Sequence, residues 1–173
     1  IENYTVYSEN NADKVAPVAE ILINAAENCR IAAGEISVKE YSGKSDVLVW
    51  ESNEGSVSWN FNVQQEGKYY LRFNYLSFNN NASSVQFSAE IDGRYPFFEA
   101  SQLEMPKAFK CENDTKQDDK GNDIRPDLTA YEEWITSPVN APGGADNNPY
   151  AFYLSAGQHT LTVNGAVMGI AIV

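Results

Sequence analysis

The most constraining feature of this sequence is a strict alternation of apolar and polar residues between positions 57 and 75. The stretch GSVSWNFNV alternates valine, tryptophan and phenylalanine with serine and asparagine, and KYYLRFNYLSF resumes the same period after a short QQEG connection. Successive side chains of a β-strand point to opposite faces, so this period predicts two half-buried strands. The short glycine-containing connection predicts that they pair as an antiparallel hairpin.

The same pattern recurs along most of the chain. SVQFSAEI alternates before a predicted turn at Asp92-Gly93, and PYAFYLSAGQHTLTVNG reads as strand, Ala156-Gly157 turn, strand. MGIAIV reads as a short apolar closing strand, and AEILI, DVLVWE and KAFK are further candidates. About eight to ten short strands are expected on this pattern.

Helix is expected to be a minor component. Only VAPVAEILINAAENC suggests one, but Pro17 interrupts it, and its β-branched residues fit a strand as well. Many short strands separated by polar turns predict an all-β fold, an antiparallel β-sandwich or jelly roll in which each sheet has one solvated face.

Length and charge restrict the class of protein further. The chain has 173 residues, near the usual size of one domain, so we expect residues 1–173 to form a single domain. Its 24 acidic and 12 basic residues give a net charge of −12, which repels nucleic acids and anionic membranes. No signal sequence or membrane-spanning segment is recognisable, and we expect a mature or excised piece of a longer extracellular protein.

The two cysteines, Cys29 and Cys111, form no metal-binding or redox motif. They are compatible either with a disulfide or with two separate thiols.

Catalytic motifs are absent from the sequence. The one histidine, His159, shares strand parity with Leu161 and Val163, so we expect it at the edge of the core with a satisfied ring nitrogen. No nucleophile elbow, zinc-protease motif or phosphate-binding loop occurs. A pair of carboxylates for glycoside hydrolysis is the remaining option, because acidic residues are numerous. We therefore expect no enzyme, with a small glycosidase or lyase as the least favoured alternative.

Metal binding is left open by the acidic run NDTKQDDKGND. Aligned with a helix–loop–helix calcium loop, it places Lys116 and Lys120 at ligand positions, which excludes that motif. We expect no cofactor, although a structural calcium bound by separate loops remains an alternative.

The best candidate ligand site follows in GNDIRPDLTAYEEW, a polar stretch expected to cross between strands. Here Asn122, Asp123 and Arg125 provide hydrogen-bonding groups, and Tyr131 and Trp134 provide rings that could stack on sugars. The alternative is structural: Arg125 would brace the loop through Asp123, and Trp134 would cap the sandwich. Of the other tryptophans, Trp59 is expected in the core and Trp50 in the core or at its rim.

Several motifs together resemble a known family. The order W-x-F-x-V-x-x-x-G-x-Y-x-L-R-x-x-Y, then IDGRYPFFEA, GNDIRP with a downstream tryptophan, and PYAFYLSAGQHTLTV is similar to a galactose-binding-like, carbohydrate-binding-module-like jelly roll. The likeness is to the accessory domain of extracellular solute-binding lipoproteins of sugar ABC transporters in Firmicutes. The two hairpin motifs are widespread among such sandwiches, whereas IDG and GNDIRP are narrower.

This resemblance implies a non-catalytic, carbohydrate-binding domain on the surface of a bacterium or outside it. Its partners would be an oligo- or polysaccharide and a neighbouring domain of the full-length chain, with no nucleic acid and no membrane insertion. The alternative is a structural or protein-interaction domain that packs against a sugar-transport or glycan-degrading neighbour, because fold alone does not fix function.

Overall fold

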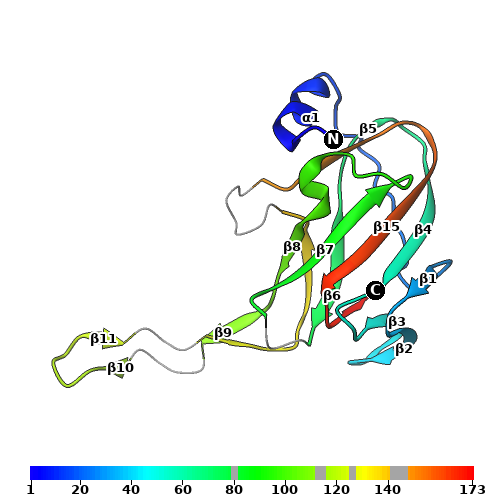
Figure 1. The fold of residues 1–173 in the computed structure, drawn as a ribbon. Coiled ribbons are helices and arrows are strands. Elements are labelled where there is room, and N and C mark those ends of the chain that lie inside the picture. The colour runs from blue at the N-terminus through cyan, green and yellow to red at the C-terminus, as the bar shows by residue number, and fades with distance from the viewer. Residues whose placement is uncertain (79–81, 112–115, 125–127, 141–147) are drawn as a thin grey trace.

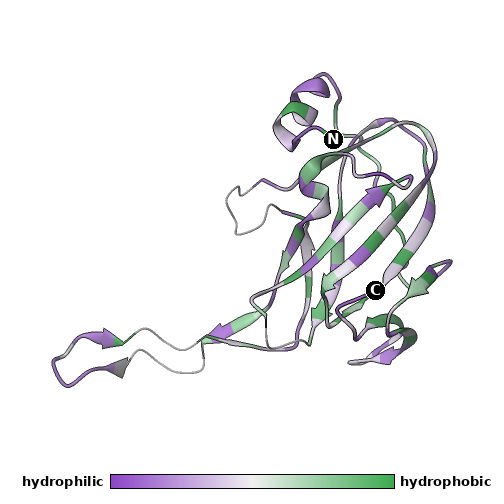
Figure 2. Ribbon diagram, in the orientation of Figure 1, coloured by the Kyte–Doolittle hydropathy of each residue, from purple (hydrophilic) through white to green (hydrophobic). Residues whose placement is uncertain are grey.

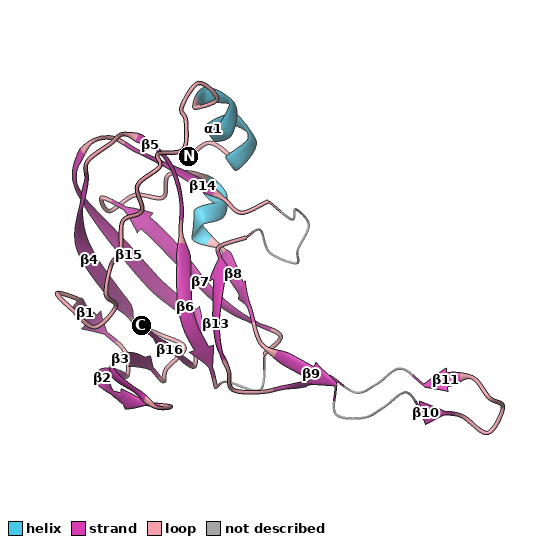
Figure 3. Cartoon of the chain, turned by 180° about the vertical axis from the view of Figure 1, so that it is seen from behind, coloured by secondary structure: helices cyan, strands magenta, loops and turns pink. Residues whose placement is uncertain are grey.

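The computed structural model describes residues 1–78, 82–111, 116–124, 128–140 and 148–173, and it confirms the all-β antiparallel sandwich. Two five-stranded sheets pack face to face (Figures 1 and 3). The first sheet has the strand order β1-β4-β15-β7-β8, and the second has the order β13-β6-β16-β3-β2. Neighbouring strands in both sheets are antiparallel.

The elements have the following bounds. The first sheet contains β1 (Arg30–Ala33), β4 (Ser56–Val63), β15 (Gly157–Val167), β7 (Ser84–Ile91) and β8 (Leu103–Pro106). The second contains β13 (Trp134–Pro138), β6 (Arg72–Ser77), β16 (Ile170–Ile172), β3 (Lys44–Trp50) and β2 (Ile36–Tyr41). The two-stranded pairs are β5 (Gly67–Tyr70) with β14 (Ala151–Leu154), β9 (Phe109–Cys111) with β12 (Leu128–Ala130), and β10 (Lys116–Gln117) with β11 (Asp123–Ile124). The helices are α1 (Tyr4–Asn10) and the 3-10 helix η1 (Phe98–Ser101).

The core lies between the sheets and follows the alternation in the sequence. Trp59 of β4 is 4% exposed and Trp50 of β3 is fully buried, so both tryptophans lie in the interior. Phe73 of the second sheet meets Phe87 of the first edge to face, with ring centroids 5.6 Å apart. Burying one such ring stabilises the fold by roughly 1.5–3 kcal/mol. Figure 2 shows hydrophobic residues alternating along the sandwich strands, whereas the β10–β11 ribbon is mostly hydrophilic.

The predicted pairing of residues 57–63 with 69–75 is wrong. β4 pairs with β1 and β15, whereas β6 pairs with β13 and β16 in the other sheet. The two strands therefore face each other across the core instead of sharing an edge. Likewise, β14 pairs with β5 and does not pair with the β15 strand that follows it. The turn at Asp92-Gly93 was placed correctly: Asp92 has φ 53° and Gly93 has φ 74°.

The helix and strand expected around residues 15–29 are also absent. This part of the chain is irregular, including the AEILI stretch at 19–23, and no strand pairs with it. It crosses the open side of the sandwich on the way to β1 (Figure 3).

The helix α1 lies nearer the N-terminus than expected. The side chain of Asn3 caps it by accepting a hydrogen bond from the Val6 N–H at 3.0 Å. Its tyrosines face β14: the Tyr4 hydroxyl accepts from the Ala151 N–H at 2.9 Å, and the Tyr7 hydroxyl accepts from the Tyr153 N–H at 2.7 Å. The helix thereby satisfies donors on a strand edge that would otherwise be unpaired.

Both cysteines are free thiols, with Cys29 half-buried and Cys111 exposed. The structure thus selects two separate thiols from the two alternatives.

The predicted crossover between strands is present, but it begins near residue 107, earlier than the polar stretch 121–134. It leaves β8 of the first sheet, runs out through β9 and β10, and returns through β11 and β12 to β13 of the second sheet. Figures 1 and 3 show the β10–β11 ribbon standing well away from the sandwich. No helix in the described part of the chain is long and apolar enough to cross a membrane.

Candidate functional site

A second apolar cluster lies on the outer face of the second sheet. Its centre is formed by Val47, Val49, Leu76 and Ala171, all at most 1% exposed. These residues have the opposite strand parity to the interior residues of the same strands, such as Trp50 of β3. They would face solvent in an ordinary two-sheet sandwich, so something must cover them.

The cover consists mainly of three half-buried aromatic residues from three separate elements: Tyr41 at the end of β2, Phe78 after β6, and Trp134 at the start of β13. The rings of Tyr41 and Phe78 have centroids 5.5 Å apart. We call these three rings and the four residues beneath them the aromatic face.

The β2–β3 hairpin curls over the sheet to build this face. Its turn uses the left-handed region at Ser42 (φ 46°) and Gly43 (φ 78°), and β3 has a third such residue at Asp46 (φ 53°). The curl brings the Ser42 carbonyl 3.3 Å from the indole Nε1 of Trp134, which donates to it. Lys44 Nζ lies 4.2 Å from the centroid of the Trp134 ring, a cation–π distance. Trp134 is therefore held in one orientation.

Polar groups border the aromatic face. Lys39 Nζ is 3.3 Å from Glu51 Oε2, and Asn74 Nδ2 donates to Thr136 Oγ1 at 3.1 Å. Burial, assisted by the charges of Glu132 and Glu51, raises the pKa of Tyr41 above its usual value. Its hydroxyl therefore stays protonated and remains a hydrogen-bond donor at neutral pH.

Tyr131 directly follows β12, at the base of the projecting ribbon. Its hydroxyl donates to Glu133 Oε2, its N–H donates to the Ala108 carbonyl at 3.1 Å, and Lys110 Nζ is 5.6 Å from its ring centroid. The hydrogen bond to Glu133 is the main reason that the pKa of Tyr131 is raised.

Asn122 and Asp123 lie on the distant ribbon. The N–H and Nδ2 of Asn122 donate to the carboxylate of Asp118 at 2.8 and 3.0 Å, and Gln117 Nε2 donates to Asp123 Oδ1 at 3.1 Å. Both residues brace the ribbon turn, and Figure 3 shows β11 far from β13. The structure thus does not bring them together with Trp134. Arg125 lies outside the described residues.

Tyr41 and Phe78 are the members of the aromatic face that the sequence did not reveal. Neither sits in a regular alternation: Tyr41 follows a register shift in β2, and Phe78 lies just past β6. A ring at a strand end gives no periodic signal.

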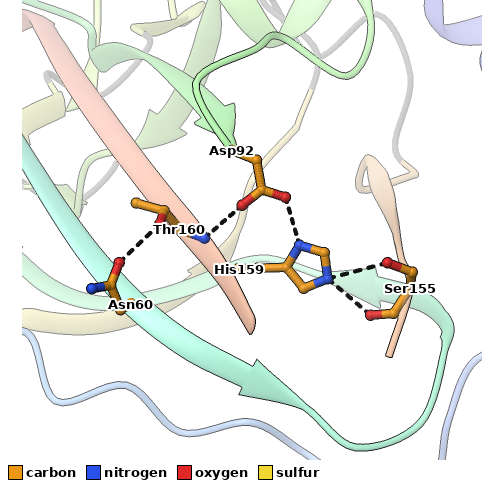
Figure 4. Close-up of polar contacts among 5 residues, drawn as sticks. All are labelled: Asn60, Asp92, Ser155, His159 and Thr160. Atoms are coloured by element: carbon orange, nitrogen blue, oxygen red, sulfur yellow. Dashed lines mark hydrogen bonds and ion pairs between the residues drawn. The ribbon is translucent and has the colours of Figure 1, made fainter. Parts of the chain in front are cut away.

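His159 is half-buried at the edge of the core, where a satisfied ring nitrogen was predicted, and both of its ring nitrogens have a hydrogen-bond partner. Its side chain is 10% exposed; Nδ1 lies 2.7 Å from Asp92 Oδ2, and Nε2 lies 2.9 Å from the Ser155 carbonyl oxygen (Figure 4). Asp92 also accepts from the Thr160 N–H at 2.8 Å. Because a carboxylate and a carbonyl both accept, this geometry is fully satisfied when both ring nitrogens carry a proton.

This network superficially resembles a serine–histidine–aspartate triad, because Ser155 Oγ is 3.4 Å from His159 Nε2. A general base needs a free lone pair on that nitrogen, and here the nitrogen faces the carbonyl oxygen of the same serine at 2.9 Å. The arrangement ties the turn before β15 to the turn after β7.

Among the described residues, no three histidine, cysteine, aspartate or glutamate side chains gather to hold a metal ion.

No family model matches the sequence, and no curated protein matches it either. Among solved structures, the chain is similar to a Paenibacillus cycloisomaltooligosaccharide glucanotransferase complexed with cycloisomaltoheptaose. The TM-score is 0.43 and the sequence identity is 16%, over 86% of this chain and 18% of that chain. This chain therefore spans less than a fifth of the length of that enzyme.

Proposed function

We propose that this chain is a non-catalytic carbohydrate-binding domain and that a glycan lies on its aromatic face. The observation that carries this proposal is the convergence of Tyr41, Phe78 and Trp134 on the outer face of one sheet. The three rings come from separate elements. They cover fully buried residues but are themselves only half-buried.

The chemistry of the face suits a sugar. Aromatic rings pack against the apolar C–H faces of sugar rings, while charged and amide groups at the border bind hydroxyls. The Tyr41 hydroxyl, the Lys39–Glu51 pair and the Asn74–Thr136 pair supply donors and acceptors around the rings. Because Trp134 is already fixed by Ser42 and Lys44, little side-chain entropy is lost on binding.

The remaining parts of the proposal rest on the sequence and on His159. The family resemblance supports a location outside a bacterial cell or on its surface. The position of His159 Nε2 against the Ser155 carbonyl oxygen supports a binding role over acyl transfer. A shallow face with few stacking contacts predicts weak affinity.

The test is a glycan array on the purified chain, followed by calorimetry on each hit. Trp134→Ala should weaken binding at least tenfold, a loss of roughly 1.4 kcal/mol, while its melting curve shows a folded protein. Phe98→Ala is the matched control, because Phe98 is 60% exposed and lies on η1, outside the aromatic face. Equal losses in both variants, or no hit with the wild-type chain, would remove the proposal.

The second candidate, an interaction domain, is favoured by the β9–β12 ribbon. Its register places Phe109, Cys111, Leu128 and Ala130 on one face, with Phe109 46% and Leu128 55% exposed. Apolar residues gathered on a projecting ribbon suit contact with a neighbouring protein domain. A wild-type chain that binds no glycan, but pulls down a neighbouring domain of its full-length protein and loses it on Phe109→Ser/Leu128→Ser, would establish this function instead.

A further inference from the structure

A cavity of about 540 Å³ lies between the sheets, and its lining extends to Asn74 and Thr136 at the border of the aromatic face. Its walls come from both sheets and from β14, and they are mainly apolar, including Trp59, Phe61, Phe73, Phe152 and Leu161. Pockets for small organic ligands typically measure about 300–1,000 Å³ and have such walls. The cavity is therefore large enough for a ligand and is built from side chains that water solvates poorly.

One wall is the irregular segment 15–25, which we call the strap. It is fixed at both ends: the Val15 carbonyl accepts from the Lys68 N–H at 3.1 Å, and the Ala25 carbonyl accepts from Trp59 Nε1 at 2.9 Å. Between these anchors, in the described structure, no backbone hydrogen bond ties positions 16–23 to another segment. A segment held only at its ends opens at low free-energy cost, which gives the cavity an entrance.

The strap has the pattern of a cavity wall. Ile21 and Ile23 line the cavity and are half-buried; Leu22 between them also belongs to the lining but is 90% exposed. Ile21 and Ile23 thus alternate with the exposed Leu22 without any strand partner, which explains why this stretch resembles a strand in sequence.

Two unpaired cations line the same cavity. Lys68 and Arg72 are among its lining residues, and within the described part of the chain neither side chain forms an ion pair or a hydrogen bond. Glu20 is the acidic residue in the lining. The whole chain has 24 acidic and 12 basic residues, so acids outnumber bases in the chain. In the lining of the cavity, by contrast, bases outnumber acids. Cations beside an apolar cavity attract an anionic group.

We propose that the cavity binds a single-chain amphiphile with an anionic head group, of the long-chain fatty acid class. The apolar chain lies between the sheets beneath the strap, and the head group pairs with Lys68 and Arg72. The net charge of −12 disfavours an anionic bilayer as the source, so the ligand is the free molecule. The three rings of the aromatic face are not among the lining residues, and the proposal does not depend on a glycan.

The first test locates the ligand. Dibromostearate quenches tryptophan fluorescence only at short range, and of the three tryptophans Trp59 lines the cavity. Titration should give saturable quenching that persists in Trp134→Phe. Quenching that disappears in Trp134→Phe would place the ligand on the aromatic face, and absence of saturable quenching would show that the cavity is not a ligand site; either result overturns the proposal.

The second test concerns the head group. Calorimetry with oleate should show about tenfold weaker binding for Lys68→Ala/Arg72→Ala, whereas oleyl alcohol should bind both proteins equally. Arg94→Ala/Lys120→Ala is the matched control, since both residues are exposed and neither lines the cavity. Equal affinities of the wild type and the Lys68/Arg72 variant for oleate would overturn the proposal, as would binding only to phosphatidylglycerol vesicles and not to free oleate.

Discussion

His159 shows how one side chain can make stability depend on pH. Burial lowers the pKa of His159, but the hydrogen bond to Asp92, the Ser155 carbonyl and the charge of Asp92 outweigh it and raise the pKa above 6.5. For Asp92, burial raises the pKa, and the Thr160 N–H and His159 outweigh it and lower the pKa below 3.8. The contribution of His159 to the free energy of unfolding is complete below pH 6.5 and is lost as the pH rises through the folded-state pKa of His159. The contribution of Asp92 is lost as the pH falls through the folded-state pKa of Asp92.

Asp92→Asn should therefore destabilise the fold by roughly 0.5–1 kcal/mol at about pH 5.5, and by less at about pH 8.5. Asparagine tolerates the left-handed φ of 53° and keeps an oxygen for the Thr160 N–H, so the charge is the main change. Urea denaturation of both proteins at the two pH values measures the difference. The same loss at both pH values would show that the ion pair is not its cause.

Lys107 is a second residue with a specific energetic effect. Its side chain is 6% exposed, its Nζ has no hydrogen-bond partner in the described structure, and burial lowers its pKa. An unsatisfied buried amine is costly, so Lys107→Met should stabilise the fold by about 1–3 kcal/mol in urea denaturation. Lys120→Met, at an exposed position, should change little; a destabilised Lys107→Met variant would contradict this interpretation.

At the residue scale, the sequence was informative where a side chain follows strand parity. The burial of Trp59 and the position of His159 at the core edge, with a satisfied ring nitrogen, were both predicted from alternation. The grouping of Trp134 with Asn122 and Asp123 rested on closeness in sequence, and the projecting ribbon separates them. A two-stranded ribbon carries its tip far from its base, and nothing in local sequence fixes that distance.

Among the elements, the strap depends on Gly67. A Cβ at this position would lie 2.5 Å from the Val15 carbonyl oxygen and 2.8 Å from Cδ of Pro17. Gly67→Ala should therefore push the strap off its anchor, destabilise the fold by roughly 1–3 kcal/mol and speed proteolysis within residues 15–25. Limited proteolysis with mass spectrometry locates the cut.

Gly93→Ala is the control for that experiment. Gly93 has φ 74° but no atom within 4 Å of an added Cβ, so alanine there is strained without touching the strap. It should lose some stability and leave strap proteolysis unchanged. If both variants speed cleavage in the strap equally, general destabilisation and not the Gly67 contact is responsible.

Strand positions were predictable from sequence, but strand partners were not. Alternation reports which face of a strand is buried, and it is the same whether the next strand lies in the same sheet or in the opposite one. The connections after β4 and β14 therefore looked like hairpins although each carries the chain to a different partner. The prediction of a strand in the strap is wrong for a related reason: the segment is extended and alternating, but no strand pairs with it.

For the whole molecule, the second sheet separates two different surfaces. Its inner face, with Phe73 and Ile172, lines the apolar cavity, and its outer face, with Leu76 and Ala171, supports the aromatic face. Adjacent residues on β6 and β16 thus serve opposite sides.

Tyr41 offers a conservative test of the outer surface. Tyr41→Phe removes one hydroxyl donor and keeps the ring, so a bound glycan should lose about threefold to tenfold in affinity without loss of stability. Calorimetry with the tightest glycan of the array measures the change. Unaltered affinity would show that the hydroxyl does not contact the sugar.

The decisive measurement is an NMR titration of the three tryptophan indole N–H signals with that glycan. Trp50 is fully buried and Trp59 is 4% exposed in the interior, whereas Trp134 lies half-buried on the outer surface. If the aromatic face binds the sugar, the Trp134 signal shifts in a saturable manner and the other two stay in place. A shift confined to Trp59, or no shift at a concentration where calorimetry shows saturation, would contradict binding at the aromatic face.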